Sequence, residues 1–121
     1  MTVVTTEDAA NADVALTDAA NARLFRVLGD STRLAIVRLL LTGPQTVGEV
    51  VAALGVPQSR VSNHLACLRW CQFVTTERRG RQVIYSIKDL RLRKLLDLAG
   101  RLSSENRDHL ATCGRIGPDW A

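Results

Sequence analysis

Several features that define large classes of protein are missing from this sequence. No apolar run approaches the ~20 residues that a membrane-spanning helix needs, so we do not expect a membrane protein. The first residues, MTVVTTEDAANAD, are acidic and lack the charged-then-apolar pattern of a signal peptide, so we expect a cytoplasmic protein. The sequence offers no nucleophile–base set, no phosphate-binding loop and no catalytic carboxylate pair, which argues against an enzyme.

Cysteine is scarce, and its number is odd. The chain has three cysteines, Cys67, Cys71 and Cys113. An odd number without a signal peptide does not indicate a disulfide framework. Metal binding, redox sensing and plain packing remain open for these thiols.

The chain is short, but its composition does not indicate disorder. Its 121 residues suit one domain, and 46% of them are hydrophobic. A monomer of this size has a small core, so dimerisation is expected. We expect an acidic, flexible segment over residues 1–15, a folded domain over 16–105 and a tail over 106–121 that carries Cys113.

Charge is unevenly distributed along the chain. Residues 1–20 carry four acidic side chains and no Lys or Arg, whereas residues 21–101 carry fourteen Lys and Arg against five acidic side chains. The middle of the chain is therefore far more basic than the net charge of +4 indicates. A basic domain suits a polyanion such as DNA, although a solvated arginine-rich surface is the alternative.

Hydrophobic periodicity predicts a mainly α fold with one β-hairpin. Helical spacing is found over about residues 17–28, 31–41, 46–54 and 58–71, and again from near residue 89. Period-two alternation at Val74 and Thr76, and at Val83, Tyr85 and Ile87, predicts two strands. Two short helices joined by Gly55-Val56-Pro57 are typical of a helix-turn-helix. The predicted order, α-α-α-α-β-β-α, is that of a winged helix-turn-helix.

The fourth predicted helix has one apolar and one polar side. At about 100° per residue, Val61, Leu65 and Leu68 face a core. Ser59, Ser62, Asn63, Ala66 and Trp70 lie on the opposite side. Since the start of such a helix reaches base edges in a major groove, the candidate DNA contacts are Gln58, Ser59, Arg60, Ser62 and Asn63. An ordinary exposed helix face is the alternative.

The hairpin tip adds positive charge. Arg78, Arg79 and Arg81 surround Gly80, which permits the turn. Such a tip can lie over phosphates or enter a minor groove, so these arginines are further DNA-binding candidates. A charged tip can also simply keep an edge hairpin soluble.

Two of the cysteines share one side of the fourth predicted helix. Cys67 and Cys71 are four residues apart, so they stack on its flank, beside Arg60 and His64. They do not share the apolar stripe, which argues against plain core packing, the common role of a free cysteine. Two thiolates one turn apart can chelate a soft ion, and a flexible tail could bring in Cys113.

Three segments together resemble one family. Residues 29–37 (GDSTRLAIV), 58–68 (QSRVSNHLACL) and 79–85 (RGRQVIY) are similar to the second helix, recognition helix and wing of the ArsR/SmtB family. The resemblance implies a homodimeric winged-helix repressor of palindromic operator DNA, with the first and last helices at the dimer interface. One departure is Gln72, where the family usually has Gly, so a left-handed cap there would be strained.

Within that family, residues 63–71 (NHLACLRWC) are similar to the cadmium- and lead-sensing members. The resemblance implies that Cys67, Cys71 and Cys113 bind Cd(II) or Pb(II), with Hg(II) as a further candidate. His64 and His109 are candidate fourth donors, and for His64 a DNA contact or a structural hydrogen bond is the preferred interpretation. The alternative function is a repressor that senses oxidants or reactive sulfur through its thiols, without metal.

Overall fold

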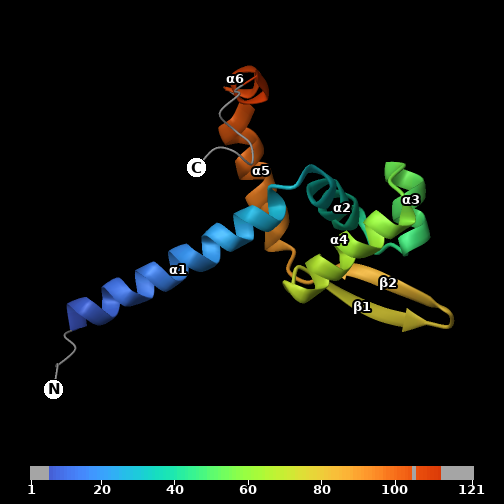
Figure 1. Ribbon diagram of the computed structural model, residues 1–121, viewed down its shortest axis with the longest axis horizontal. Coiled ribbons are helices and arrows are strands. Elements are labelled where there is room, and N and C mark those ends of the chain that lie inside the picture. Colours follow the sequence, from blue (N-terminus) through green and yellow to red (C-terminus); the bar gives the residue numbers. More distant parts are fainter. Residues whose placement is uncertain (1–5, 105, 113–121) are drawn as a thin grey trace. The chain divides into compact units, whose positions relative to one another are not determined.

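The computed structural model describes residues 6–104 and 106–112 (Figure 1). The chain divides into two compact units, Met1–Lys88 and Asp89–Ala121. The first contains α1 (Thr6–Leu28), α2 (Ser31–Thr42), α3 (Val47–Leu54), α4 (Gln58–Trp70), β1 (Val74–Arg79) and β2 (Gln82–Ile87). The second contains α5 (Arg91–Ser104) and α6 (Arg107–Thr112). This order confirms the mainly α architecture with a small hairpin.

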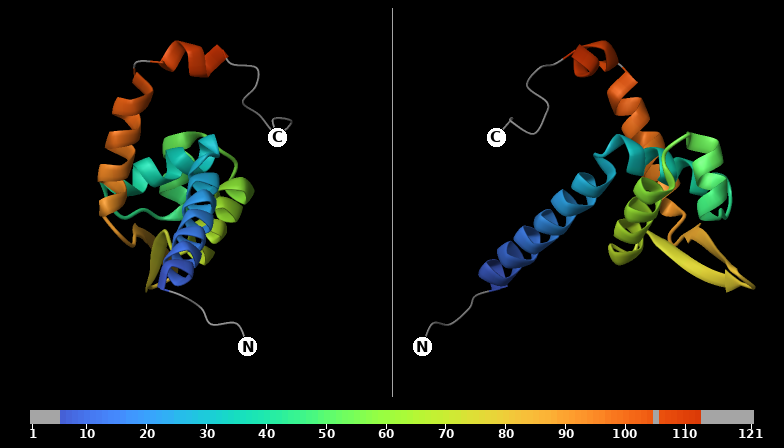
Figure 2. Two further views of the ribbon diagram at one scale, coloured as in Figure 1. Left: turned by 90° about the vertical axis from the view of Figure 1, so that its left-hand side faces the viewer. Right: turned by 45° about the vertical axis from the view of Figure 1, so that its right-hand side comes forward.

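Helix α1 begins at Thr6, well before the Thr17 expected from the sequence. Alanine-rich sequence favours a helix here, and Glu7 and Asp8 in the first turn suit the positive end of the helix dipole. All residues from 6 to 23 are exposed, and α1 runs outward from α2 (Figure 2). Burial within one chain is thus confined to the last turns of the helix, where Leu28 is buried, and local propensity favours the rest.

Helices α2 and α3 both begin with side-chain caps. The Asp30 carboxylate accepts a hydrogen bond of 2.9 Å from the backbone N–H of Arg33 at the start of α2. Thr46 and Glu49 form a reciprocal capping box at the start of α3. Gly55 then ends α3 in the left-handed region, with φ of 65°. The turn between α3 and α4 is thus set by local chemistry.

The core of the first unit lies between α2, α3, α4 and β1. Val61, Leu65 and Leu68 of α4 are each 0% exposed, as the helical angles predict. The other buried apolar residues are Leu28, Ile36, Val37, Leu40, Val50 and Val74. Burial of one apolar face of α4 leaves the opposite face free to meet a partner.

The hairpin is antiparallel and is held against the rest of the unit. Thr76 pairs with Tyr85, and Gly80 turns the tip with φ of 61°. Gln45, just before α3, exchanges two backbone hydrogen bonds of 3.0 and 2.8 Å with Tyr85. These bonds fix β2 relative to the start of the helix-turn-helix.

At the end of α4, Gln72 adopts the left-handed conformation in which a residue other than glycine is strained. Gln72 has φ of 63°, and its N–H bonds to the Arg69 carbonyl at 3.0 Å. The N–H of Phe73 bonds to the Leu68 carbonyl at 2.9 Å, which completes a Schellman motif. The Lys88 ammonium donates to Gln72 Oε1 at 2.7 Å. Gln72 therefore accepts the left-handed conformation that glycine adopts without strain.

The second unit exposes most of its apolar side chains. In α5, Leu98 and Leu102 are 53% and 72% exposed, and no residue is buried. Asp89, just before α5, accepts hydrogen bonds from the Arg91 guanidinium and backbone N–H, which lowers the pKa of Asp89 to about 2. Helix α6 was not expected from the sequence. Among the described residues, no helix is both long and apolar enough to cross a bilayer.

Candidate nucleic-acid interface and metal site

The outer face of α4 is polar near its start and exposed along its length. The predicted DNA contacts Gln58, Ser59, Arg60, Ser62 and Asn63 are all exposed. Pro57 occupies the N-cap and offers no side-chain hydrogen bond to the first turn. The Arg60 N–H bonds to the Pro57 carbonyl at 3.1 Å, which leaves the N–H groups of Gln58 and Ser59 for water or for a ligand such as a phosphate. This face has the chemistry of a helix that reads DNA.

The hairpin tip presents the three predicted arginines to solvent. Arg78, Arg79 and Arg81 are exposed around Gly80. Arg79 forms an ion pair of 3.3 Å with Glu77 on the same strand. The Glu77 carboxylate offsets part of the positive charge of Arg79, but the tip as a whole remains cationic.

His64 lies on the flank of α4 rather than on its outer face. It is half-buried, and its charge acts on Asp30 at the start of α2. The pKa of Asp30 is lowered mainly by the hydrogen bond from the Arg33 N–H, with a further contribution from His64. His64 thus interacts electrostatically with the start of α2, while its structural hydrogen bond and its DNA contact both stay predictions.

Cys67 and Cys71 lie together at the end of α4. Cys67 is half-buried, and Cys71 is exposed and forms the C-cap of the helix. The Cys71 N–H bonds to the Cys67 carbonyl at 2.9 Å, so the two residues are one helical turn apart. Partial desolvation raises the pKa of the Cys71 thiol, and the charge and hydrogen bond of Cys67 raise it further. The two sulfurs are therefore near neighbours.

Arg33 is a component of this region that the sequence did not single out. Its Nε donates a hydrogen bond of 2.8 Å to the Val27 carbonyl at the end of α1. Its positive charge also acts on Cys71 and opposes the rise in the pKa of that thiol. The interaction with Cys71 depends on how α2 packs against α4, so no local sequence signal could reveal it.

Two of the three predicted metal ligands lie among the described residues. Two adjacent thiols on a rigid helix are suitable ligands for a thiophilic ion. The predicted third ligand, Cys113, lies outside the described residues. Within the described part of the chain, no group of three His, Cys, Asp or Glu side chains could hold a metal ion. The structure therefore brings two of the three predicted ligands together.

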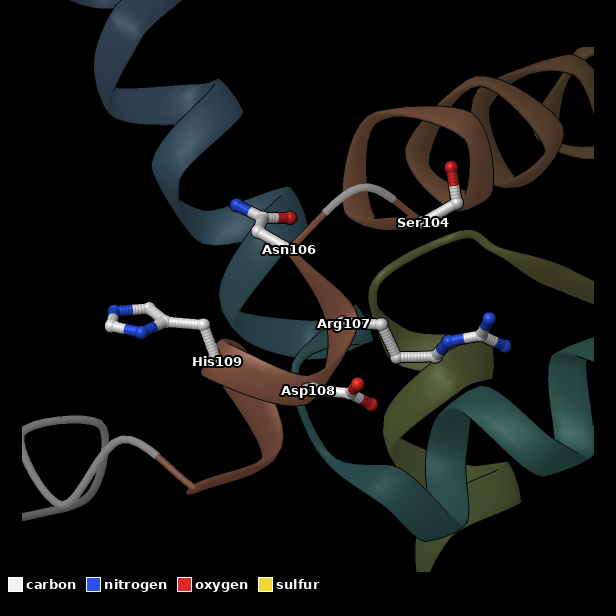
Figure 3. Close-up of a pocket in the computed structure, with 5 residues that line it drawn as sticks. All are labelled: Ser104, Asn106, Arg107, Asp108 and His109. Carbon is white, nitrogen blue, oxygen red and sulfur yellow. The ribbon is translucent and has the colours of Figure 1, made fainter.

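His109, a candidate fourth donor, lies in a hollow of the second unit. Ser104, Asn106, Arg107, Asp108 and His109 line this hollow (Figure 3). The His109 ring points away from the side chains of Arg107 and Asp108. These side chains do not converge as metal ligands do, so the hollow itself is no metal site.

The sequence is similar to those of known regulators. The family described as "Bacterial regulatory protein, arsR family" matches residues 30–76. A probable mercury resistance operon repressor from Streptomyces lividans is 42% identical over 95 residues, 78% of this chain and 76% of the relative. The HTH-type transcriptional regulator CmtR from Mycobacterium tuberculosis is 46% identical over 79 residues, 65% of this chain and 67% of the relative.

Solved structures share the fold. The NMR structure of CmtR from Mycobacterium tuberculosis, described as a cadmium metal-sensor, has a TM-score of 0.55 at 46% identity and covers 63% of this chain and 79% of that chain. The homodimeric winged helix-turn-helix domain of Mb0332 from Mycobacterium bovis has a TM-score of 0.67 at 26% identity, covering 90% of this chain and 95% of that chain. The winged helix-turn-helix prediction is confirmed.

These relatives are regulators of transcription, which confirms that the chain is not an enzyme. The family match spans α2, the helix-turn-helix and the start of β1, the segments that position the outer face of α4. On this shared sequence and fold, the chain belongs to the arsR family of bacterial regulatory proteins.

Proposed function

We propose that this protein is a homodimeric repressor that binds palindromic operator DNA and is released by a thiophilic metal. The effector is Cd(II) or Pb(II), with Hg(II) as a further candidate, and the ligands are Cys67, Cys71 and Cys113. The observation that carries the proposal is the pair of adjacent thiols on α4, the helix whose outer face carries the DNA-binding candidates.

DNA binding rests on α4 and the hairpin tip. A dimer places two copies of α4 in successive major grooves, so the operator is expected to be a palindrome. On α4, the DNA contacts would be made by Gln58, Ser59, Arg60, Ser62, Asn63 and His64. At the hairpin tip, contacts to phosphates or to the minor groove would be made by Arg78, Arg79 and Arg81. A regulator that binds operator DNA must have access to the chromosome, so we propose that the protein is cytoplasmic.

Dimerisation is supported by the exposed apolar residues of α5. Leu98 and Leu102 expose more than half of their surface, which a second copy of the chain would cover. The relative Mb0332 is described as homodimeric. In the dimer, Cys113 of one subunit is proposed to join Cys67 and Cys71 of the other.

A bound metal ion would link the three cysteine sulfurs through metal–sulfur bonds. Cys67 and Cys71 must first lose their protons, and the pKa of Cys71 lies above its ordinary value. Metal affinity is therefore expected to rise with pH through the range in which these thiols ionise. Because Cys71 caps α4, a change in its position alters the end of the DNA-reading helix. Release follows if metal binds the free dimer more tightly than the DNA complex.

The test is a titration of operator-bound protein with Cd(II), Pb(II) and Hg(II), followed by fluorescence anisotropy of a labelled duplex. The duplex is selected from a random library by the protein itself. At least one ion should release the wild type, and Cys67→Ser should stay bound at the same concentration. Thiolate-to-metal absorption should fall in each of Cys67→Ser, Cys71→Ser and Cys113→Ser. If none of the three ions releases the protein from the operator, the proposal is disproved.

The same samples test the thiol-sensing alternative. A raised pKa for Cys71 keeps this thiol protonated at neutral pH, which slows attack on an oxidant or polysulfide. Mass spectrometry after mild peroxide or polysulfide would detect a link between Cys113 and Cys67 or Cys71. Release of DNA by that link, together with no response to metal, would favour the alternative.

A further inference from the structure

Two hollows on the first unit meet at one side chain, Tyr85 of β2. The first lies between α4 and the hairpin and is lined by Ala66, Arg69, Trp70, Gln72 and Tyr85. The second lies between the start of α3 and the hairpin, where Arg81 and Tyr85 are among the lining residues. Tyr85 is half-buried and is shared by both. The two hollows therefore border the same side chain, one toward α4 and the other toward the start of α3.

The charge of this surface suits a polyanion. Arg69 lies in one hollow and Arg81 in the other, and among the described residues no acidic side chain lines either of them. Lys88, whose ammonium group is bonded to Gln72 Oε1 at 2.7 Å, adds a cation beside the first hollow. A phosphate chain that crossed both hollows would meet positive charge at each end of its path.

Trp70 gives the surface a flat apolar element. Its side chain is 88% exposed at the end of α4, on the same face as Asn63 and Ala66. The indole offers a broad ring and one N–H donor. A deoxyribose ring and its phosphate present the complementary pair of an apolar face and an acceptor oxygen. The exposed ring therefore continues the candidate DNA face of α4 toward the hairpin.

We propose that Arg69, Trp70, Arg81 and Tyr85, here called the Tyr85 surface, hold the sugar–phosphate backbone of one DNA strand. The inference rests on the proposed DNA binding. If α4 enters a major groove and the hairpin tip meets the neighbouring groove, the strand that separates these grooves passes between α4 and β2. The Tyr85 surface occupies that place, and its contacts set affinity and register without reading bases.

The experiment measures binding to two duplexes, the site selected by the protein and a scrambled duplex of equal length. Trp70→Ala should weaken binding to both by about tenfold, because the contact of the ring with the sugar and the hydrogen bond of the indole N–H are lost. Arg69→Gln should make the slope of log K against log salt less negative by about two, because the dimer loses one phosphate contact from each subunit. Asn63→Ala, by contrast, should weaken the selected site more than the scrambled duplex, because Asn63 is placed at base edges.

A matched control removes an arginine away from this surface. Arg38 is exposed on α2, so Arg38→Gln should leave both affinities and the salt slope as in the wild type. Circular dichroism of each variant should match the wild type, because Trp70, Arg69 and Arg38 are exposed. Tyr85→Phe keeps the ring and removes only the hydroxyl, and a loss of about threefold is expected if that hydroxyl contacts a phosphate.

A spectroscopic readout follows Trp70 directly. The chain has two tryptophans, so Trp120→Phe leaves Trp70 as the single reporter. Its emission should shift or be quenched when either duplex is added. Unchanged emission, with wild-type affinity in Trp70→Ala and Arg69→Gln, would overturn the inference while leaving DNA binding intact. A change in dimer dissociation in place of DNA affinity would overturn it as well, whereas failure of the wild type to bind any duplex would defeat the proposed function itself.

Discussion

Helices α4 and α5 both have an apolar face by sequence, but only α4 buries it within one chain. Val61, Leu65 and Leu68 of α4 are each 0% exposed, and α4 packs on α2, α3 and β1. In α5 no residue is buried, and Leu102 is 72% exposed. Periodicity therefore shows that a helix has an apolar face but not what covers it. We infer that a second copy of the chain covers the face of α5.

The largest effect should come from the buried face of α4. Leu65→Ala is expected to lower the free energy of unfolding by about 2–5 kcal/mol, because the surrounding core cannot fill the cavity. The matched change in α5, Leu102→Ala, should cost less than about 0.5 kcal/mol when unfolding by urea is followed at low protein concentration. Equal losses would contradict the comparison of the two helices.

The apolar face of α5 should control association instead. The double variant Leu98→Ser/Leu102→Ser is expected to raise the dimer dissociation constant at least tenfold, as loss of a central apolar contact does. Sedimentation velocity over a concentration series measures this constant. Leu90→Ser is the control, since Leu90 is 66% exposed but lies outside α5. Unaltered association in the double variant would show that α5 is not the dimer helix.

The end of α4 offers a smaller, stabilising change. Gln72→Gly should raise the free energy of unfolding by about 0.5–1 kcal/mol, because glycine adopts φ of 63° without strain. The loss of the exposed hydrogen bond from Lys88 offsets part of this gain. Lys88→Ala measures that part separately in the same urea titration. A fall in stability for Gln72→Gly would contradict the left-handed cap.

The start of α5 should show the smallest effect, and only in acid. Hydrogen bonds from Arg91 lower the pKa of Asp89 from 3.8 to about 2 in the folded chain. Its contribution to stability is therefore present above pH 3.8 and is lost as the pH falls through 2. Asp89 is exposed to solvent, so the change in stability should be slight. NMR titration of the Asp89 carboxyl carbon should give a midpoint near 2, and a midpoint near 3.8 would disprove the capping contact.

The first unit could be predicted because its elements are set locally. Thr46 and Glu49 stand three residues apart, which is the spacing of a capping box, and they form one at the start of α3. Gly80 turns the hairpin, and Val61 and Leu65 face the core as their angles require. In each case, neighbouring residues contain the whole signal.

Other features needed information that the local sequence does not hold. The electrostatic interaction of Arg33 with Cys71 depends on the packing of α2 against α4. The early start of α1 was missed because its polar, acidic composition resembles a loose segment, although alanine favours a helix. The DNA contacts and the role of Cys113 stay predictions, since they depend on a partner strand and a second subunit.

The central claim is that thiols on the DNA-reading helix couple metal binding to DNA release. The most direct measurement compares the affinity of Cd(II) or Pb(II) for the free protein and for its complex with the selected operator, by competition with a chelator at fixed pH. We predict that the free protein binds the effector at least tenfold more tightly, and that Cys67→Ser abolishes the difference. Equal affinities in the free and DNA-bound protein would contradict the account.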